Sequence, residues 1–154
     1  MENCIFCKIA KGEIPCVKIW EDEKHLAFLD LSPNTEGMTL VMTKRHFDSD
    51  ATDMPEKEYS DLMLAAKKVS KILEKGLDVK RVAIVMEGHG VNHVHIRLYP
   101  IYGLEKKFIE TWAKDRVYFD KYQGYISTQL GPEKSTKERQ DIADKIFKKI
   151  NTRI

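Results

Sequence analysis

The sequence predicts an α+β domain: a mostly antiparallel sheet that carries one long helix and is followed by a C-terminal helical extension. Three observations predict this class. Short apolar segments bounded by turn residues recur before residue 50 and again after residue 80. Between them, apolar residues return every three or four positions up to Gly76, which is the period of an amphipathic helix. A second stretch with this period lies at 135–150.

The first half of the chain is predicted to form one short helix and three strands. Residues 3–11 favour a helix that ends before Gly12. The strand candidates are residues 16–21, 25–30 and 38–43. The gap between the first two strands has the length of a hairpin loop, and the run at 32–34 contains a proline and marks the turn before the third.

The long helix has recognisable start and stop signals. Pro55 suits its first turn, because a proline there loses no helical hydrogen bond. Glu56 and Glu58 favour the same turn, since acidic side chains interact well with the positive end of the helix dipole. Gly76 ends the helix. The sequence therefore predicts a helix that follows the third strand and covers the sheet.

The remaining elements follow from shorter patterns. They are a central strand at 81–86, a strand at 93–99 that Pro100 stops, and helices at 105–117 and 135–150. We expect residues 1–103 to form one domain. Residues 104–154 are expected to form a C-terminal helical extension packed on that same domain.

Composition excludes several classes of protein. The formal net charge is +2, from 26 basic and 24 acidic residues, so no specific nucleic acid binding is predicted. No apolar run approaches the roughly 18 residues of a membrane helix. The first residues lack the basic start and apolar segment of a secretory signal, so we expect a cytoplasmic protein. The three cysteines are then thiols or metal ligands and not disulfides.

A row of polar residues interrupts the last predicted strand. His93, His95 and Arg97 alternate along it, so their side chains would share one face, and the apolar residues between them would enter the core. Buried polar groups need partners, so such a row suits an anion or a metal ion. The alternative is the exposed polar face of an edge strand.

Cys4 and Cys7 form a Cys-x-x-Cys pair near the start of the chain. Two thiolates at this spacing supply half of a tetrahedral zinc site, and the other two ligands must come from elsewhere. His46 and His93 are the available candidates. A redox-active pair, or two free thiols, are the alternatives that spacing leaves open.

The stretch at 90–98 resembles the signature of the histidine triad superfamily, His-x-His-x-His followed by apolar residues. Further blocks resemble the family in order and spacing, at residues 4–15, 28–33, 37–41 and 44–46. The resemblance covers about residues 3–100. It implies a nucleotide-binding α+β fold, usually a homodimer, whose substrate is a nucleotide or a nucleotide conjugate.

The resemblance also implies a mechanism and a set of site residues. His95 takes the place of the middle histidine, which attacks an α-phosphorus and forms a nucleotidyl-histidine that water or another acceptor resolves. The implied base pocket comprises Phe6, Ile9, Ile14 and Leu31, with Asp30 at the ribose and Gly88 and Gly90 in the loop near the phosphate. The implied structural zinc ligands are Cys4, Cys7, His46 and His93.

The third triad position departs from the family pattern, because it is Arg97 and not histidine. A guanidinium binds phosphate bidentately, but it cannot give up a proton near neutral pH. A branch of the superfamily with glutamine at this position is active. The predicted function is therefore a nucleotide hydrolase or nucleotidyl transferase, and the alternative is a non-catalytic, zinc-containing nucleotide-binding module.

Overall fold

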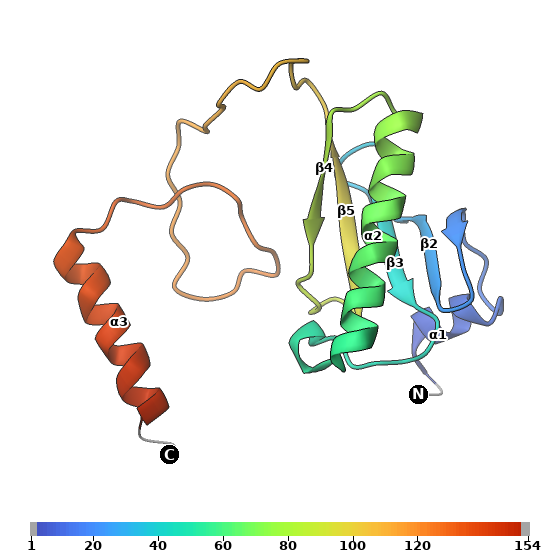
Figure 1. Ribbon diagram of the computed structural model, residues 1–154, viewed down its shortest axis with the longest axis horizontal. Helices are drawn as coiled ribbons and strands as arrows, with labels where there is room; N and C mark the ends of the chain where they lie inside the picture. Colours follow the sequence, from blue (N-terminus) through green and yellow to red (C-terminus); the bar gives the residue numbers. More distant parts are fainter. Residues whose placement is uncertain (1–2, 152–154) are drawn as a thin grey trace. The chain divides into compact units, whose positions relative to one another are not determined.

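The computed structural model describes residues 3–151 and divides into two compact units, Met1–Glu110 and Thr111–Ile154. The first unit holds a sheet with helices on both sides (Figure 1). Its elements are α1 (Ile5–Ala10), β1 (Lys18–Glu21), β2 (His25–Leu29), β3 (Thr39–Thr43), a 3-10 turn (Ala51–Asp53), α2 (Glu56–Gly76), β4 (Arg81–Val85) and β5 (His95–Ile101). The predicted fold class is confirmed.

The five strands lie in the order β1-β2-β3-β5-β4, and each neighbouring pair is antiparallel. The register places His25 opposite Thr43, and Met42 opposite His95. β3 therefore lies at the centre, between the N-terminal hairpin and the strand that carries the histidine row. This arrangement brings the start of β5 close to the end of β3.

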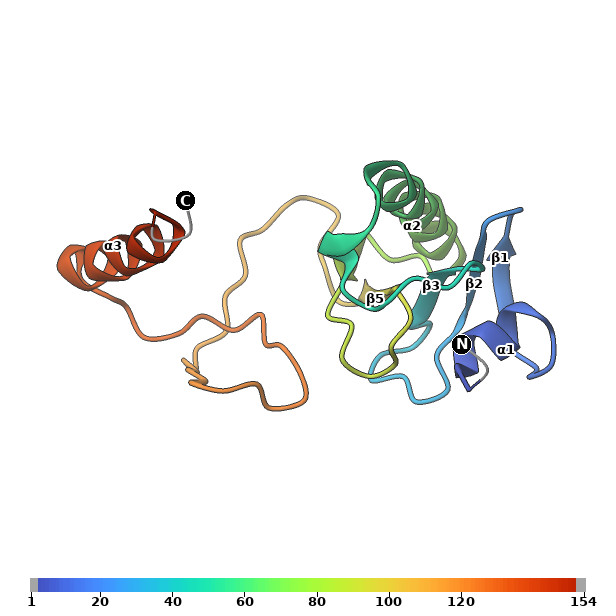
Figure 2. The same ribbon diagram turned by 90° about the horizontal axis from the view of Figure 1, so that it is seen from below.

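Helix α2 covers one face of the sheet (Figure 2). It begins after Pro55 with two acids in its first turn, as the sequence predicts. Its apolar stripe, which includes Leu62 and Val69, is buried against Val41 of β3 and Ile96 of β5. Burial of this stripe supplies the main hydrophobic contribution to the stability of the unit.

A smaller apolar cluster fills the opposite face, below α1. Phe6 of α1 packs there with Phe28 of β2, and the two rings meet edge to face with centroids 6.0 Å apart. Leu40 and Met42 of β3 complete the floor. Alternation along β2 and β3 therefore divides their side chains between two cores, and the second core lies beside the histidine row.

Replacement of Leu62 by alanine is expected to lower the free energy of unfolding by about 2–5 kcal/mol, because it leaves a cavity in the core. The Leu62 side chain is 0% exposed. Leu64→Ala is the matched control on the same helix, since Leu64 is 63% exposed. Urea denaturation measures both values, and equal losses from the two variants would contradict the placement of α2.

The prediction of a central strand at 81–86 is wrong. β4 ends the strand order and pairs only with β5 among the described strands. Of its apolar residues only Val82 is buried, and Ile84 is exposed. An apolar run reports the hydrophobicity of a segment and not the number of its neighbours, so it did not distinguish an edge strand from a central one.

The boundaries of the last strand also differ from the prediction. β5 begins at His95, because His93 lies in a turn in which its backbone N–H bonds the Val91 carbonyl at 2.8 Å. The strand continues through Pro100, which pairs with Val82 of β4. Proline removes a donor but keeps its carbonyl, and that of Pro100 accepts a hydrogen bond from the Thr35 hydroxyl.

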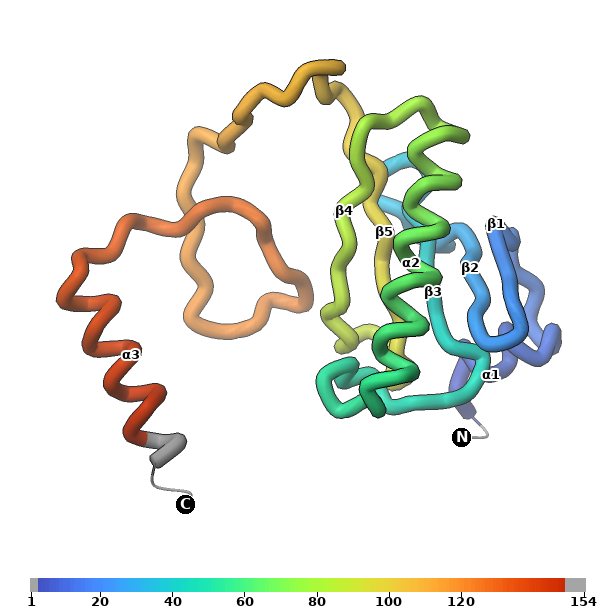
Figure 3. The backbone as a smooth tube through the Cα atoms, in the orientation of Figure 1, coloured from blue at the N-terminus to red at the C-terminus, as the bar shows by residue number. Residues whose placement is uncertain are grey.

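The predicted helix at 105–117 is absent from the described structure, which holds neither helix nor strand over residues 104–135 (Figure 3). Short isolated helices are marginal unless an apolar face packs, and Phe108 and Trp112 are exposed. The predicted C-terminal helix is confirmed as α3 (Thr136–Asn151). The packing of the extension on the domain stays a prediction. No described helix is long and apolar enough to span a membrane.

Candidate functional site

Four side chains from distant parts of the chain meet at one end of the sheet. Their ligand atoms all lie within 4.8 Å of one another, and they belong to Cys4, Cys7, His46 and His93. Cys4 caps α1 and Cys7 lies within it, whereas His46 follows β3 and His93 precedes β5. The antiparallel pairing of β3 with β5 brings the two histidines together, with ring centroids 5.0 Å apart. This cluster could hold a metal ion.

Hydrogen bonds orient both histidine rings of the cluster. His93 Nε2 donates to the Thr43 carbonyl at 2.7 Å, so Nδ1 is left with its lone pair facing the two sulfur atoms. His46 Nε2 lies 3.5 Å from Asp48 Oδ1, and its Nδ1 also faces Cys7. Burial lowers the pKa of the His93 imidazole, which favours the neutral form that binds metals.

His95 stands next to this cluster but is not part of it. Its Nδ1 donates to the His93 carbonyl at 2.7 Å, which leaves the lone pair on Nε2. Within the described residues, no hydrogen bond reaches Nε2. The pKa of His95 is lowered, chiefly by burial and further by the charge of Arg97. Burial therefore favours the neutral imidazole, whose free lone pair lies on Nε2.

Arg97 lies two residues further along β5, and Leu40, its partner across the sheet, belongs to the same core as Phe6. Its Nη1 is 3.3 Å from Glu87 Oε2, in an ion pair whose acid is almost fully buried. Gly90 gives the guanidinium space, since a Cβ at that position would lie 3.2 Å from Arg97 Nη2. His95 and Arg97 alternate along β5 and therefore share one face, as predicted, whereas His93 precedes the strand and is not part of that row.

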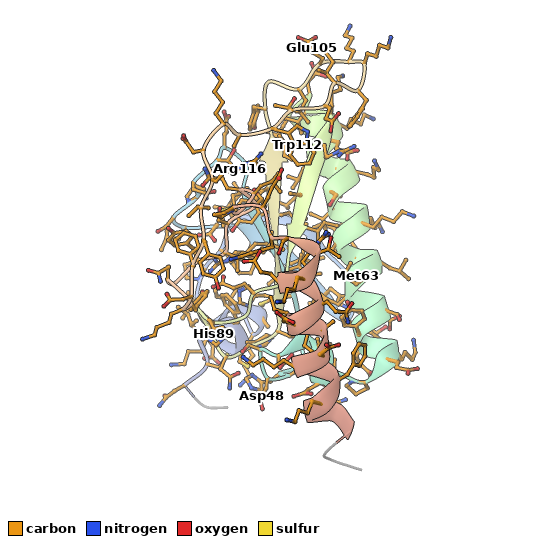
Figure 4. The ribbon with its side chains drawn as sticks, turned by 90° about the vertical axis from the view of Figure 1, so that its left-hand side faces the viewer. Asp48, Met63, His89, Glu105, Trp112 and Arg116 are labelled. Carbon is orange, nitrogen blue, oxygen red and sulfur yellow. The ribbon has the colours of Figure 1, made fainter. Side chains whose placement is uncertain are left out.

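The loop between β4 and β5 needs glycine at one position in particular. Gly88 has a φ of +78°, and a Cβ there would lie 2.6 Å from the Ser49 carbonyl oxygen. Only glycine adopts this backbone conformation freely and allows the close approach. Asn92 also ties this loop to the segment after β3, because its side chain bonds Asp48 and the Ser49 N–H. Asp48 and His89 lie at the end of the domain opposite Glu105 (Figure 4).

The structure places the residues of the expected nucleotide pocket at different depths. Phe6 lies against His95, with ring centroids 5.1 Å apart, and Ile9 packs partly buried on the same cluster. Asp30 accepts a hydrogen bond from the Ser32 N–H, and its charge raises the pKa of His95 against the larger effect of burial. Two other residues of the expected pocket are not brought to His95 by any described contact, the half-buried Ile14 and the 98% exposed Leu31.

Glu87 is the site residue that the sequence patterns do not identify. It follows β4 directly before the glycine loop, and its carboxylate pairs with Arg97 across the hairpin. The signal available in the sequence is an acid between an apolar strand and a glycine. That signal is common in turns, so the pairing becomes visible only when β4 and β5 are placed side by side.

Comparison with known proteins places the chain in a family. The HIT domain family matches residues 11–102. The protein named Hit of Bacillus subtilis is 38% identical over 118 residues, which cover 72% of this chain and 79% of that protein. The adenosine 5'-monophosphoramidase of Saccharomyces cerevisiae is 36% identical over 124 residues, which cover 77% of this chain and 75% of the yeast protein.

Solved structures agree with this placement. A Streptococcus mutans protein of known crystal structure is 30% identical in sequence to this chain and superposes with a TM-score of 0.70. The alignment covers 97% of this chain and 87% of the Streptococcus mutans chain. A HIT family protein from Bacillus anthracis is 30% identical and has a TM-score of 0.64, and the alignment covers 96% of this chain and 97% of the Bacillus anthracis chain. The extension is included in both likenesses. From its sequence and its fold, the chain belongs to the HIT domain family.

Proposed function

We propose that the protein hydrolyses nucleotide conjugates, or transfers their nucleotidyl group, at the α-phosphorus through a covalent intermediate on His95. One observation carries the proposal: His95 Nδ1–H donates a hydrogen bond to the His93 carbonyl oxygen, which leaves the lone pair on Nε2, and Arg97 follows two residues later on the same strand. The names of relatives support the substrate class, because three of them are called adenosine 5'-monophosphoramidase.

Each residue has a role in the proposed reaction. His95 Nε2 attacks the α-phosphorus, the bond to the leaving group breaks, and an amine leaves with the electron pair and takes a proton from water. The imidazolium that forms keeps its Nδ1 proton, which it donates in a hydrogen bond to the His93 carbonyl oxygen. Arg97 and the backbone amides of the 88–90 loop stabilise charge on the phosphate oxygens. Water then attacks phosphorus and gives its proton to the hydroxide that the first step left, and the bond to Nε2 breaks to release the nucleotide and the neutral imidazole.

We further propose that the cysteine–histidine cluster binds one structural zinc ion. With Zn–S bonds of about 2.3 Å and Zn–N bonds of about 2.05 Å, a tetrahedral ion separates sulfur from nitrogen by about 3.6 Å. The distances from Cys4 Sγ to His93 Nδ1 and from Cys7 Sγ to His46 and His93 Nδ1 are 3.5, 3.4 and 3.5 Å. The donor set and its spacing therefore fit zinc, which would link α1 to the ends of β3 and β5.

Two properties of the whole protein complete the proposal. β4 is an edge strand with an exposed isoleucine, which supports the homodimer that the resemblance implies. Exposed aromatic residues such as Trp112 and Tyr118 support packing of residues 104–154 on the domain. Two of the three cysteines stand in the proposed zinc site and none is paired in a disulfide, a use of cysteine typical of a reducing compartment, which supports a cytoplasmic location.

Purified protein is expected to release AMP from adenosine 5'-monophosphoramidate. The reason is that the P–N bond places an amine opposite the attacking His95 Nε2, and an amine leaves once it takes a proton. Chromatography measures AMP over time, with heat-denatured protein as the blank. Binding of AMP by equilibrium dialysis without any turnover would contradict the proposed reaction and would favour the non-catalytic nucleotide-binding module.

A further inference from the structure

Glu87 is a buried acid whose position the proposed chemistry does not explain. Its side chain is 7% exposed, and it makes an ion pair with Arg97, which is itself 30% exposed. The Arg97 Nε is buried and makes no hydrogen bond within the described residues. An acid that only oriented the guanidinium would be expected to bond it more completely, in the bidentate geometry typical of arginine and carboxylate.

Glu87 also borders a hollow on the surface of the first unit. Besides Arg97, Glu87 lines an open hollow of about 440 Å³ between the loop at 49–52, the first turn of α2 at Tyr59, and the loop at 86–89. The hollow is lined by both polar and apolar atoms. Glu87 thus stands between the phosphate-binding arginine and a space large enough for a small organic group.

Arg97 links Glu87 to His95. His95 and Arg97 alternate along β5, so their side chains share one face of the strand. Glu87 Oε2 lies 3.3 Å from Arg97 Nη1. A phosphate that is bound by Arg97 beside His95 therefore has its substituents within reach of the charge of Glu87.

We propose that Glu87 is a specificity-determining residue that selects the leaving group, and that the hollow beside it receives that group. A negative carboxylate attracts an amine, which donates N–H bonds and is a cation once protonated. The same carboxylate repels a leaving group made of further phosphates. This inference rests on the proposed function and adds to it a preference for amine conjugates over polyphosphates. A single charge near a partly buried site changes such a preference by about tenfold.

Glu87→Gln tests the proposal because it removes the charge and keeps the shape and one acceptor oxygen for Arg97. The value of kcat/KM is measured for adenosine 5'-monophosphoramidate and for diadenosine tetraphosphate. The variant is expected to raise the relative rate on the polyphosphate by about tenfold. Glu87→Asp, which keeps the charge, is expected to retain the wild-type order. Glu23→Gln, an exposed acid on another loop, is the matched control. An unchanged ratio in Glu87→Gln would overturn the proposal.

A binding measurement separates this proposal from the proposed reaction. Dissociation constants for AMP and ADP are determined by calorimetry, which needs no turnover. Glu87→Gln is expected to strengthen the binding of ADP relative to that of AMP by about tenfold, since ADP brings an extra phosphate close to the position of the carboxylate. If this change in binding were found while the wild type hydrolysed no substrate, the proposed reaction would be contradicted and the role of Glu87 would still be supported. Equal changes for both nucleotides, or no nucleotide binding by the wild type, would overturn the role of Glu87.

Discussion

His95→Asn is expected to lower the rate of AMP release on the order of 10⁴-fold or more, because it removes the nucleophile of the proposed reaction. Asparagine is the informative choice. Its side-chain amide can still donate to the His93 carbonyl, which is the bond that His95 Nδ1 makes at 2.7 Å. It has no lone pair of comparable nucleophilicity at the Nε2 position. The variant therefore separates loss of the nucleophile from loss of the local hydrogen bond.

His25→Asn is the matched control for this prediction. His25 and His95 are both 4% exposed, but His25 lies at the start of β2 and pairs with Asp22. Its replacement is expected to leave turnover within the same order of magnitude as that of the wild type. Circular dichroism verifies that both variants fold. Equal rates for the wild type and His95→Asn would refute nucleophilic catalysis by His95.

Cys7→Ser is expected to abolish stoichiometric zinc binding and to lower the free energy of unfolding by about 4 kcal/mol or more, as the loss of a structural metal does. Cys7 Sγ lies 3.4 Å from His46 Nδ1 and 3.5 Å from His93 Nδ1, so its loss removes a partner from both histidines of the cluster. Zinc bound there would join α1 to the ends of two strands. Burial also raises the pKa of the Cys7 thiol.

Elemental analysis and urea denaturation measure the two effects. The wild type is expected to contain about one zinc ion per chain, the content of a single Cys2His2 site. Cys16→Ser is the control, because Cys16 is half-buried on the same core and is not part of the cluster. It is expected to keep the zinc. The structural zinc site would be refuted if wild-type protein that is purified under reducing conditions contained no metal. Equal loss of zinc from Cys7→Ser and Cys16→Ser would refute it as well.

Elements with a strong period could be predicted from the sequence, and elements that depend on neighbours could not. The stripe of α2 is long enough to define both its face and its ends, and Leu62 and Val69 are buried as its period requires. The position of β4 in the sheet depends on which strands pair, which no local pattern encodes. Residues 105–117 have helical spacing, but a helix forms only where such a face finds a surface.

In the candidate site too, local patterns could be predicted from the sequence, whereas contacts between separate elements could not. The alternation at 93–97 predicts a shared face, and the structure brings His95 and Arg97 to it. Cys4 and Cys7 alone define half of a metal site, and the resemblance, not the spacing, supplies its other half. Glu87 was missed, because an ion pair between two strands depends on their register. Leu31 shows the converse, since a residue expected in a pocket lies exposed on a turn.

The central claim is that His95 becomes covalently bound to the nucleotide. Intact-protein mass spectrometry of samples quenched within the first turnover tests it most directly, with adenosine 5'-monophosphoramidate as substrate. The wild type is expected to carry one AMP per chain, on a peptide that contains His95, and the His25→Asn control should carry the same adduct. Rapid turnover by the wild type with no adduct at any quench time, or an adduct that persists in His95→Asn, would contradict the mechanism.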